Sequence, residues 1–151
     1  MSEKFNRPTL PDRGLFQEIR QDDRDLLATY GQFMGVQPDY DMIRQGDTQT
    51  HLYFVISGKL EVRRQGMQDD IVVGVIGEGE SIGEISVFDE GEASASIRAL
   101  EFSQIWKIDG DSIKSFLNDN PVAGNHIMIS IATILSKRVR KLSEQLVSAR
   151  T

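Results

Sequence analysis

The chain has no cysteine among its 151 residues. Disulfide bonds, thiolate metal sites and a cysteine nucleophile are therefore excluded, and the composition fits a reducing compartment. No apolar run approaches the ~20 residues that a membrane-spanning helix needs, and the opening MSEKFNRPTLPDRG lacks the apolar core of a signal peptide. We therefore expect a cytoplasmic protein that makes no membrane contact.

Positive charge is also in deficit, because 17 Lys and Arg stand against 23 Asp and Glu, for a formal net charge of −6. A general attraction to nucleic acid or to an anionic membrane is therefore not expected. The two histidines, His51 and His126, lie far apart and outside any metal-binding spacing, and both are predicted to be surface residues. The phosphate-loop pattern G-x-x-x-x-G-K-[ST] is absent. We predict no catalytic residue, no metal site, no cofactor and no enzymatic activity.

The length, with 39% hydrophobic and 26% charged residues, fits one globular domain. The periodicity of apolar residues changes along it. Residues 1–14, which contain Pro8 and Pro11, are predicted to be a flexible arm. The remaining segments are predicted as helices over 15–35, a β-structure over 42–108 and further helices over 111–148.

The N-terminal helical segment is expected in two pieces. Leu15, Phe16 and Ile19 form an apolar stripe that should pack on the main body of the domain. A break follows, where Asp22 or Asp23 can cap the second helix.

Between residues 42 and 108 apolar and polar residues alternate with a period of two, and glycine-containing turns separate the runs. This pattern predicts an antiparallel barrel or sandwich. Trp106, the only tryptophan, is interpreted as a core or domain-face residue rather than a platform for a ligand. The strands are expected at about 42–44, 52–57, 59–64, 71–76, 95–101 and 102–108.

A short helix over 112–118 and a long one over 121–148 should close the chain, with Pro121 in the first turn of the long helix and Asn120 as its cap. Two apolar stripes run along the long helix. The first, which we assign to packing on the parent domain, contains Ile127, Ile131 and Ile134. The second has heptad spacing and contains Met128, Ala132, Leu135, Val139, Leu142, Leu146 and Ala149.

The heptad stripe, with β-branched Val139 at one core position and Leu135 and Leu142 at the other, favours a parallel two-stranded contact. We therefore predict a homodimer through this helix. The alternative is one broad apolar face covered by the chain's own domain. The basic run Lys137-Arg138-Val139-Arg140-Lys141 is interpreted as a solvated flank that offsets the helix dipole, although a nucleic-acid or partner contact stays open.

The chain is organised around residues 75–101, which read VIGEGESIGEISVFDEGEASASIRALE. Gly83 and Glu84 open a run from Ile85 to Phe88 that is long enough for about one helical turn. The free N–H groups and positive dipole end of such a turn can hold phosphate. Glu84 would repel that anion unless it accepted hydrogen bonds from hydroxyl groups. The natural ligand is therefore a phosphate attached to a sugar.

These residues resemble the phosphate-binding cassette of cyclic nucleotide-binding domains, the module of catabolite activator protein-like and protein kinase A regulatory subunit-like proteins. The family pattern is close to F-G-E-[LM]-[AS]-L followed by R-[AS]-A-[ST]-V-x-A. Here it reads IGEISV at 82–87 and ASASIRA at 93–99. IRQGD at 43–47 and LYFVISGKLEV at 52–62 also resemble the family's opening strands. The resemblance extends over roughly residues 15–148 and places the cassette at 82–98.

The resemblance implies a mainly β fold with flanking helices. It consists of an antiparallel β-roll (jelly roll), N-terminal helices and a long C-terminal helix. It also implies a ligand site: Glu84 accepts a bond from the ribose 2′-hydroxyl, backbone amides meet the phosphate oxygens, and the Ser94 hydroxyl adds a donor. The residues expected to contact the ligand are Gly83, Glu84, Ile85, Ser86, Ala93, Ser94 and Ala95.

Ala93 stands where the family has the arginine that grips the phosphate. Loss of such a charge-assisted bond weakens binding by roughly ten- to a hundredfold if nothing replaces it. Arg98 is the nearest cation in sequence, but strand alternation places it on one face with Ser96 and Leu100, as a surface residue. Three outcomes stay open: weak binding of cyclic AMP or cyclic GMP, a different ligand, or an empty module.

By this resemblance we expect a non-enzymatic, stand-alone regulatory module that is dimeric and repositions its C-terminal helix when the cassette is filled. The competing reading is a protein-interaction module that kept the fold and lost the ligand. A third is a subunit that recruits a DNA-binding or enzymatic protein through its basic helix end. Transcription factors of the family carry a further helix-turn-helix, whereas this sequence stops at Thr151, so direct DNA binding is not expected.

Overall fold

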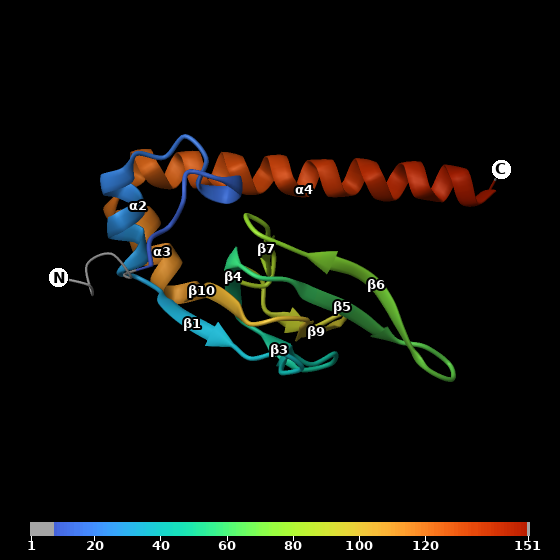
Figure 1. Ribbon diagram of the computed structural model, residues 1–151. Helices are drawn as coiled ribbons and strands as arrows, with labels where there is room; N and C mark the ends of the chain where they lie inside the picture. The colour runs from blue at the N-terminus through green and yellow to red at the C-terminus, as the bar shows by residue number, and fades with distance from the viewer. Residues whose placement is uncertain (1–7, 151) are drawn as a thin grey trace.

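The computed structural model describes residues 8–150 as a β-roll with helices gathered at one end and one long helix passing over it (Figure 1). The helical elements are η1 (Gly14–Phe16), α2 (Gln21–Ala28), α3 (Gly110–Asp119) and α4 (Pro121–Arg150). The strands are β1 (Gln32–Val36), β2 (Asp41–Ile43), β3 (Thr48–Gln49), β4 (His51–Ser57), β5 (Leu60–Gln65), β6 (Asp70–Ile76), β7 (Ser81–Ile82), β8 (Gly91–Glu92), β9 (Ser96–Ala99) and β10 (Ser103–Asp109).

The strands form two four-stranded sheets, ordered β1-β10-β4-β7 and β2-β9-β5-β6, and a small β3-β8 pair. Every pairing is antiparallel. Apart from β5 and β6, the neighbouring strands are not consecutive in the chain, as in a roll whose two sheets face each other. The predicted fold class, a mainly β jelly roll with N-terminal helices and a long C-terminal helix, is confirmed.

The larger apolar cluster joins the helices to the first sheet. The Phe16 ring lies 4.6 Å from that of Phe54 and 5.7 Å from that of Trp106, between ring centroids. Trp106 is fully buried, and its indole Nε1 donates to the Ala28 carbonyl at 3.3 Å. Its interpretation as a core residue is correct. A second cluster, between the two sheets, contains Val36, Ile43, Val55, Leu60, Ile97, Ala99 and Ile105.

The N-terminal region differs from its prediction in two ways. Part of the predicted flexible arm, residues 1–7, lies outside the described residues. Residues 8–14 are not loosely held, because Leu10 is buried and its carbonyl accepts a bond from Arg24 Nε at 3.0 Å. The expected first helix is only the single 3₁₀ turn η1. Leu15, Phe16 and Ile19 are nevertheless buried on the main body, as their spacing predicted.

Helix α2 begins after Arg20, so neither Asp22 nor Asp23 is its cap. Both lie in its first turn, where a negative charge interacts favourably with the helix dipole. The segment after α2, predicted as helical to residue 35, contains strand β1. Pairing with β10, for example Phe33 opposite Trp106, decides this strand. A long-range contact of this kind overrides local preference and leaves no signal in the segment itself.

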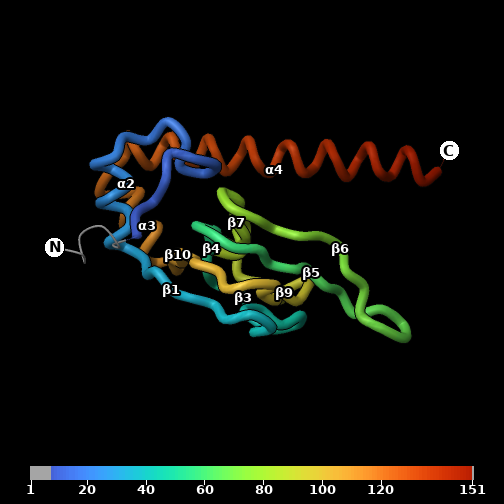
Figure 2. The backbone as a smooth tube through the Cα atoms, viewed as in Figure 1, coloured from blue at the N-terminus to red at the C-terminus, as the bar shows by residue number. Residues whose placement is uncertain are grey.

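Helices α3 and α4 agree with their predicted ranges within a few residues. The Asp109 carboxylate caps α3 by accepting a bond from Ser112 N at 2.8 Å. Asn120 was predicted to cap α4, but its side chain instead donates to the Phe116 carbonyl of α3 at 3.4 Å. Figure 2 shows α4 continuing well beyond the packed helices as a straight rod. None of the helices described here is both long and apolar enough to cross a membrane.

The two apolar stripes on α4 have different surroundings. Ile127 and Ile131 are buried, and Ile134 is packed against the larger cluster, as expected for the stripe assigned to the parent domain. Leu135 of the heptad stripe also packs partly on that cluster. The other predicted dimer residues are exposed, with relative exposures of 40% for Met128, 61% for Val139, 60% for Leu142 and 64% for Leu146.

Candidate ligand-binding site

A cavity of about 540 Å³ lies between the cassette, strands β4 and β6, and helix α4. Its size falls within the ~300–1,000 Å³ of small-molecule sites. Of the predicted contact residues, Gly83, Ser86, Ala93, Ser94 and Ala95 line it. The rest of its wall is formed by Ile43, Gln49, His51, Tyr53, Val62, Val73, Ile76, Glu80, Ser81, Ile82, Glu92, Ile97, Arg138 and Lys141.

The cassette enters the cavity through Gly83, which has a φ of +85°. A Cβ at this position would lie 2.3 Å from the His51 carbonyl oxygen, so only glycine fits. The next residues form one turn closed by bonds from Val87 N to Gly83 O (3.1 Å) and from Asp89 N to Ile85 O (2.8 Å). The predicted helical turn is therefore present. The Ile85 side chain is exposed and does not line the cavity.

Glu84 is almost completely buried, at 2% exposure, and its carboxylate is held from two sides. Its Oε1 accepts bonds from Ser81 Oγ at 2.5 Å and from Arg138 Nη2 at 3.0 Å, and its Oε2 accepts from Arg138 Nη1 at 2.8 Å. Arg138 Nη2 also donates to the Ser81 carbonyl at 3.1 Å. The paired, two-pronged geometry is the strongest that arginine makes with a carboxylate.

Arg138 belongs to α4, more than 50 residues from Glu84 along the chain. The interpretation of the basic run at 137–141 as only a solvated flank is therefore wrong for Arg138. Lys141, one helical turn further on, lines the same cavity. Sequence analysis missed both residues. Their spacing of three, which puts them on one helix face, was the available signal.

Ala93 lies with its neighbours at the β3-β8 edge of the cavity. Its backbone N–H donates to the Asp47 carbonyl at 2.8 Å, and its carbonyl accepts from Gly46 N at 2.9 Å. The backbone around the missing family arginine is thus fixed by strand-like bonds. The Ala93 side chain contributes only its methyl group to the cavity.

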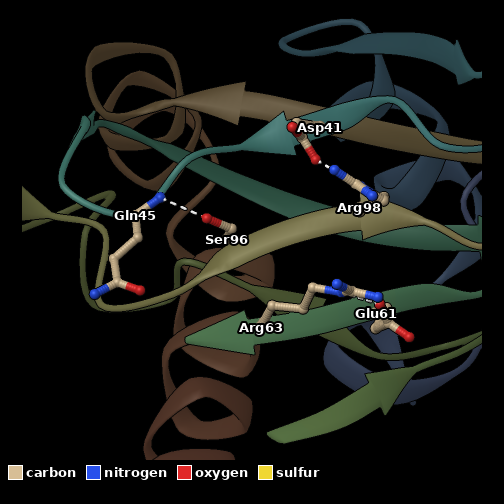
Figure 3. Close-up of polar contacts among 6 residues, drawn as sticks. All are labelled: Asp41, Gln45, Glu61, Arg63, Ser96 and Arg98. Atoms are coloured by element: carbon tan, nitrogen blue, oxygen red, sulfur yellow. Dashed lines mark hydrogen bonds and ion pairs between the residues drawn. The ribbon is translucent and has the colours of Figure 1, made fainter. Parts of the chain in front are cut away.

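Arg98 does not replace the missing arginine. Figure 3 shows it on β9, turned toward Asp41 of β2, and its Nε donates to Asp41 Oδ1 at 2.9 Å. This bond is the main reason that the pKa of the Asp41 carboxyl is lowered. Arg98 is not among the residues that line the cavity, and the neighbouring Arg63 pairs with Glu61 on the same sheet. Arg98 is therefore a surface strand residue, as expected.

His51 is not a simple surface residue, because its ring lines the cavity beside that of Tyr53, with 6.0 Å between ring centroids. Its Nδ1 shares a hydrogen bond with Thr50 Oγ1 at 3.0 Å. Burial lowers the pKa of His51, the positive charge of Lys107 lowers it further, and Asp109 offsets part of the effect. The cavity therefore contains a neutral imidazole at pH 7.

The chain is thus a β-roll with a cavity of small-molecule size between a glycine-entered turn and helix α4. The sequence profile of the cyclic nucleotide-binding domain matches residues 36–120. The chain belongs to the cyclic nucleotide-binding domain family.

Among curated proteins, the chain is 23% identical over 140 residues to the CRP-like cAMP-activated global transcriptional regulator of Mycobacterium tuberculosis, with 81% of this chain and 61% of that protein covered. It is 28% identical over 133 residues to the cyclic AMP receptor protein of Thermus thermophilus, with coverages of 87% and 60%. The chain thus spans about six tenths of the length of these relatives. The crystal structure of Thermus thermophilus catabolite activator protein superposes with a TM-score of 0.81 at 27% identity, over 91% of this chain and 63% of that one.

The low pKa of His51 predicts a pH-dependent stability. The unfolded chain takes up the His51 proton near pH ~6.5, whereas the folded protein takes it up only at lower pH. Stability should therefore fall as the pH drops from about 7 through this window, and the fall should be smaller in His51→Gln. NMR titration of the His51 ring gives the folded pKa, and urea unfolding at several pH values gives the stability. A His51 pKa at or above 6.5 would contradict the cause assigned here.

Proposed function

We propose that the protein is a non-enzymatic regulatory module that binds cyclic AMP, or a related cyclic nucleotide, in the cavity beside the cassette. The observation that carries this proposal is the buried Glu84 carboxylate directly after the glycine turn, which is held by Ser81 and Arg138, two residues that line a cavity of nucleotide size. The names of both curated relatives refer to cyclic AMP. In this proposal the ligand's ribose hydroxyl donates to Glu84, and its phosphate faces the cassette.

The cassette residues have separate tasks in this arrangement. Gly83, Ile85 and Ser86 offer backbone N–H groups from the turn, so the exposed side chain of Ile85 does not disqualify it. Ser94 offers its hydroxyl and Ala95 its backbone amide from the opposite wall, and both residues line the cavity. Ala93 offers no polar group, which makes the natural site weaker than one with arginine.

The signal would pass through α4. Arg138 connects this helix directly to Glu84, the residue assigned to the sugar. A ligand that binds one position of α4 more tightly than another shifts the helix toward that position, whereas a ligand with equal affinity for both shifts nothing. The contact between Arg138 and Glu84 is the place where the two positions can differ.

The exposed heptad stripe of α4 supports a homodimer. Val139, Leu142 and Leu146 are all more than half exposed on the part of α4 that runs over the β-roll beyond the packed helices (Figure 1). Arg138 and Lys141, which line the cavity, lie on a different side of the same helix from this stripe. Pairing of two α4 helices would cover the stripe and leave the cavity contacts intact.

The second candidate function is a protein-interaction module that has lost its nucleotide. Ala93 is the observation that favours it, since the expected clamp for the phosphate is absent and Arg98 is engaged with Asp41. Direct DNA binding is not part of either proposal. Two of the four cations at 137–141, Arg138 and Lys141, line the cavity together with cassette residues, so the basic run does not form one continuous surface for DNA.

Calorimetric titration with cyclic AMP separates the two candidates. The wild-type protein should bind, and Ala93→Arg should bind roughly ten- to a hundredfold more tightly, because it restores a charge-assisted bond to the phosphate. Binding by Ala93→Arg alone would favour the interaction module. Binding by neither protein, with cyclic GMP also tested, would contradict the proposal.

The dimer is tested by sedimentation at micromolar concentration. The wild-type protein should sediment at twice its chain mass of 17.0 kDa. The double variant Leu142→Gln, Leu146→Gln should sediment as a monomer, because polar side chains at heptad core positions remove the apolar contact. Glu144→Gln, which introduces the same residue on the opposite side of the helix, should stay dimeric. A wild-type monomer would refute the dimer.

A further inference from the structure

We propose that Lys141 of α4 supplies the positive charge that Ala93 does not, so that the terminal helix itself carries the phosphate-binding group of the cavity. This inference rests on the proposed function and names the residue that makes an anionic ligand acceptable in a site without the cassette arginine. Lys141 and Ala93 line the same cavity, from α4 and from the cassette respectively.

The charges around the cavity are few. Among its lining residues the charged side chains are Glu80, Glu92, Arg138 and Lys141. Both cations come from α4, and both carboxylates would repel a phosphate. An anionic ligand can therefore enter favourably only if a cation of α4 faces it.

Arg138 is already engaged. Both of its terminal nitrogens bond to Glu84, and Nη2 bonds to the Ser81 carbonyl as well. Removing it from Glu84 would leave a buried carboxylate without its counter-charge, which is costly. The charge of Arg138 is thus balanced by Glu84 and is not free for a phosphate.

Lys141 is in a different state. Within residues 8–150, no ion pair or hydrogen bond involves its ammonium group. It lies one turn beyond Arg138 on the cavity side of α4. A lysine is a compact point charge on a flexible stem, which suits it to a phosphate whose exact position the backbone amides and the hydroxyls of Ser86 and Ser94 determine.

Because Lys141 belongs to α4, its position determines which arrangement of the helix a bound ligand favours. A cation on the cassette would stay in the cavity whatever the helix did, whereas Lys141 is present only while α4 lies over the cavity. The ligand therefore binds the docked position of α4 more tightly, and a filled cavity stabilises that position.

The test is calorimetric titration of the full chain with cyclic AMP, using Lys141→Gln and the matched control Lys137→Gln. Lys137 belongs to the same basic run but lines a separate groove beside Gly14 and Glu18. Lys141→Gln should weaken binding about tenfold or more, and Lys137→Gln less than about twofold. In an Ala93→Arg background, the effect of Lys141→Gln should shrink to less than about threefold, because the cassette arginine then faces the phosphate.

The outcomes distinguish this inference from the proposed function. If the wild-type protein binds and Lys141→Gln binds equally well, Lys141 has no such role and the proposed function stands. Equal losses in Lys141→Gln and Lys137→Gln would show only general electrostatics and would also overturn the inference. If neither the wild-type protein nor Ala93→Arg binds cyclic AMP or cyclic GMP, the proposed function fails and this inference with it.

Discussion

The contact between Glu84 and Arg138 is the interaction on which the rest of the site depends. A carboxylate exposed by only 2% needs a counter-charge, and the cassette supplies none, because its one cation, Arg98, pairs with Asp41; Ser81, just before the cassette, adds only a hydroxyl. The counter-charge comes from α4, at the other end of the chain. Because both partners are needed, the cassette is complete only when α4 lies over it, and the cavity exists between the two.

The same contact leaves room for a ligand. An ionised carboxylate has about four acceptor positions, and the Glu84 oxygens use three, for Ser81 Oγ and the two Arg138 nitrogens. One position remains for a sugar hydroxyl. Because Glu84 is 2% exposed and does not itself line the cavity, that hydroxyl would reach it past Ser81 and Arg138, which do. The charge balance at this point is already neutral, which makes Lys141 the group that decides whether a phosphate is accepted nearby.

The β-roll, the cassette and the long helix could be predicted from sequence because each has a local pattern: alternation over 42–108, glycine with glutamate at 83–84, and heptad spacing along α4. Strand β1 could not, since its pairing with β10 decides it. Arg138 was visible only as part of a basic run. A basic run does not reveal which acidic residue each of its cations contacts, and Glu84, the buried carboxylate that pairs with Arg138, lies 54 residues away. His51 was predicted only as a surface residue for a similar reason, because its partial burial and its place in the cavity lining come from the fold around it.

A double-mutant cycle on the unfolding free energy tests the central claim most directly. The variants are Glu84→Gln, Arg138→Gln and the two combined, each unfolded in urea. Because Arg138 is about half exposed, its pairing is worth less than that of a fully buried pair, but a coupling energy of at least ~1.5 kcal/mol is expected between the two sites. Additive effects within ~0.5 kcal/mol would contradict the account, because α4 would then not be tied to the cassette through this pair.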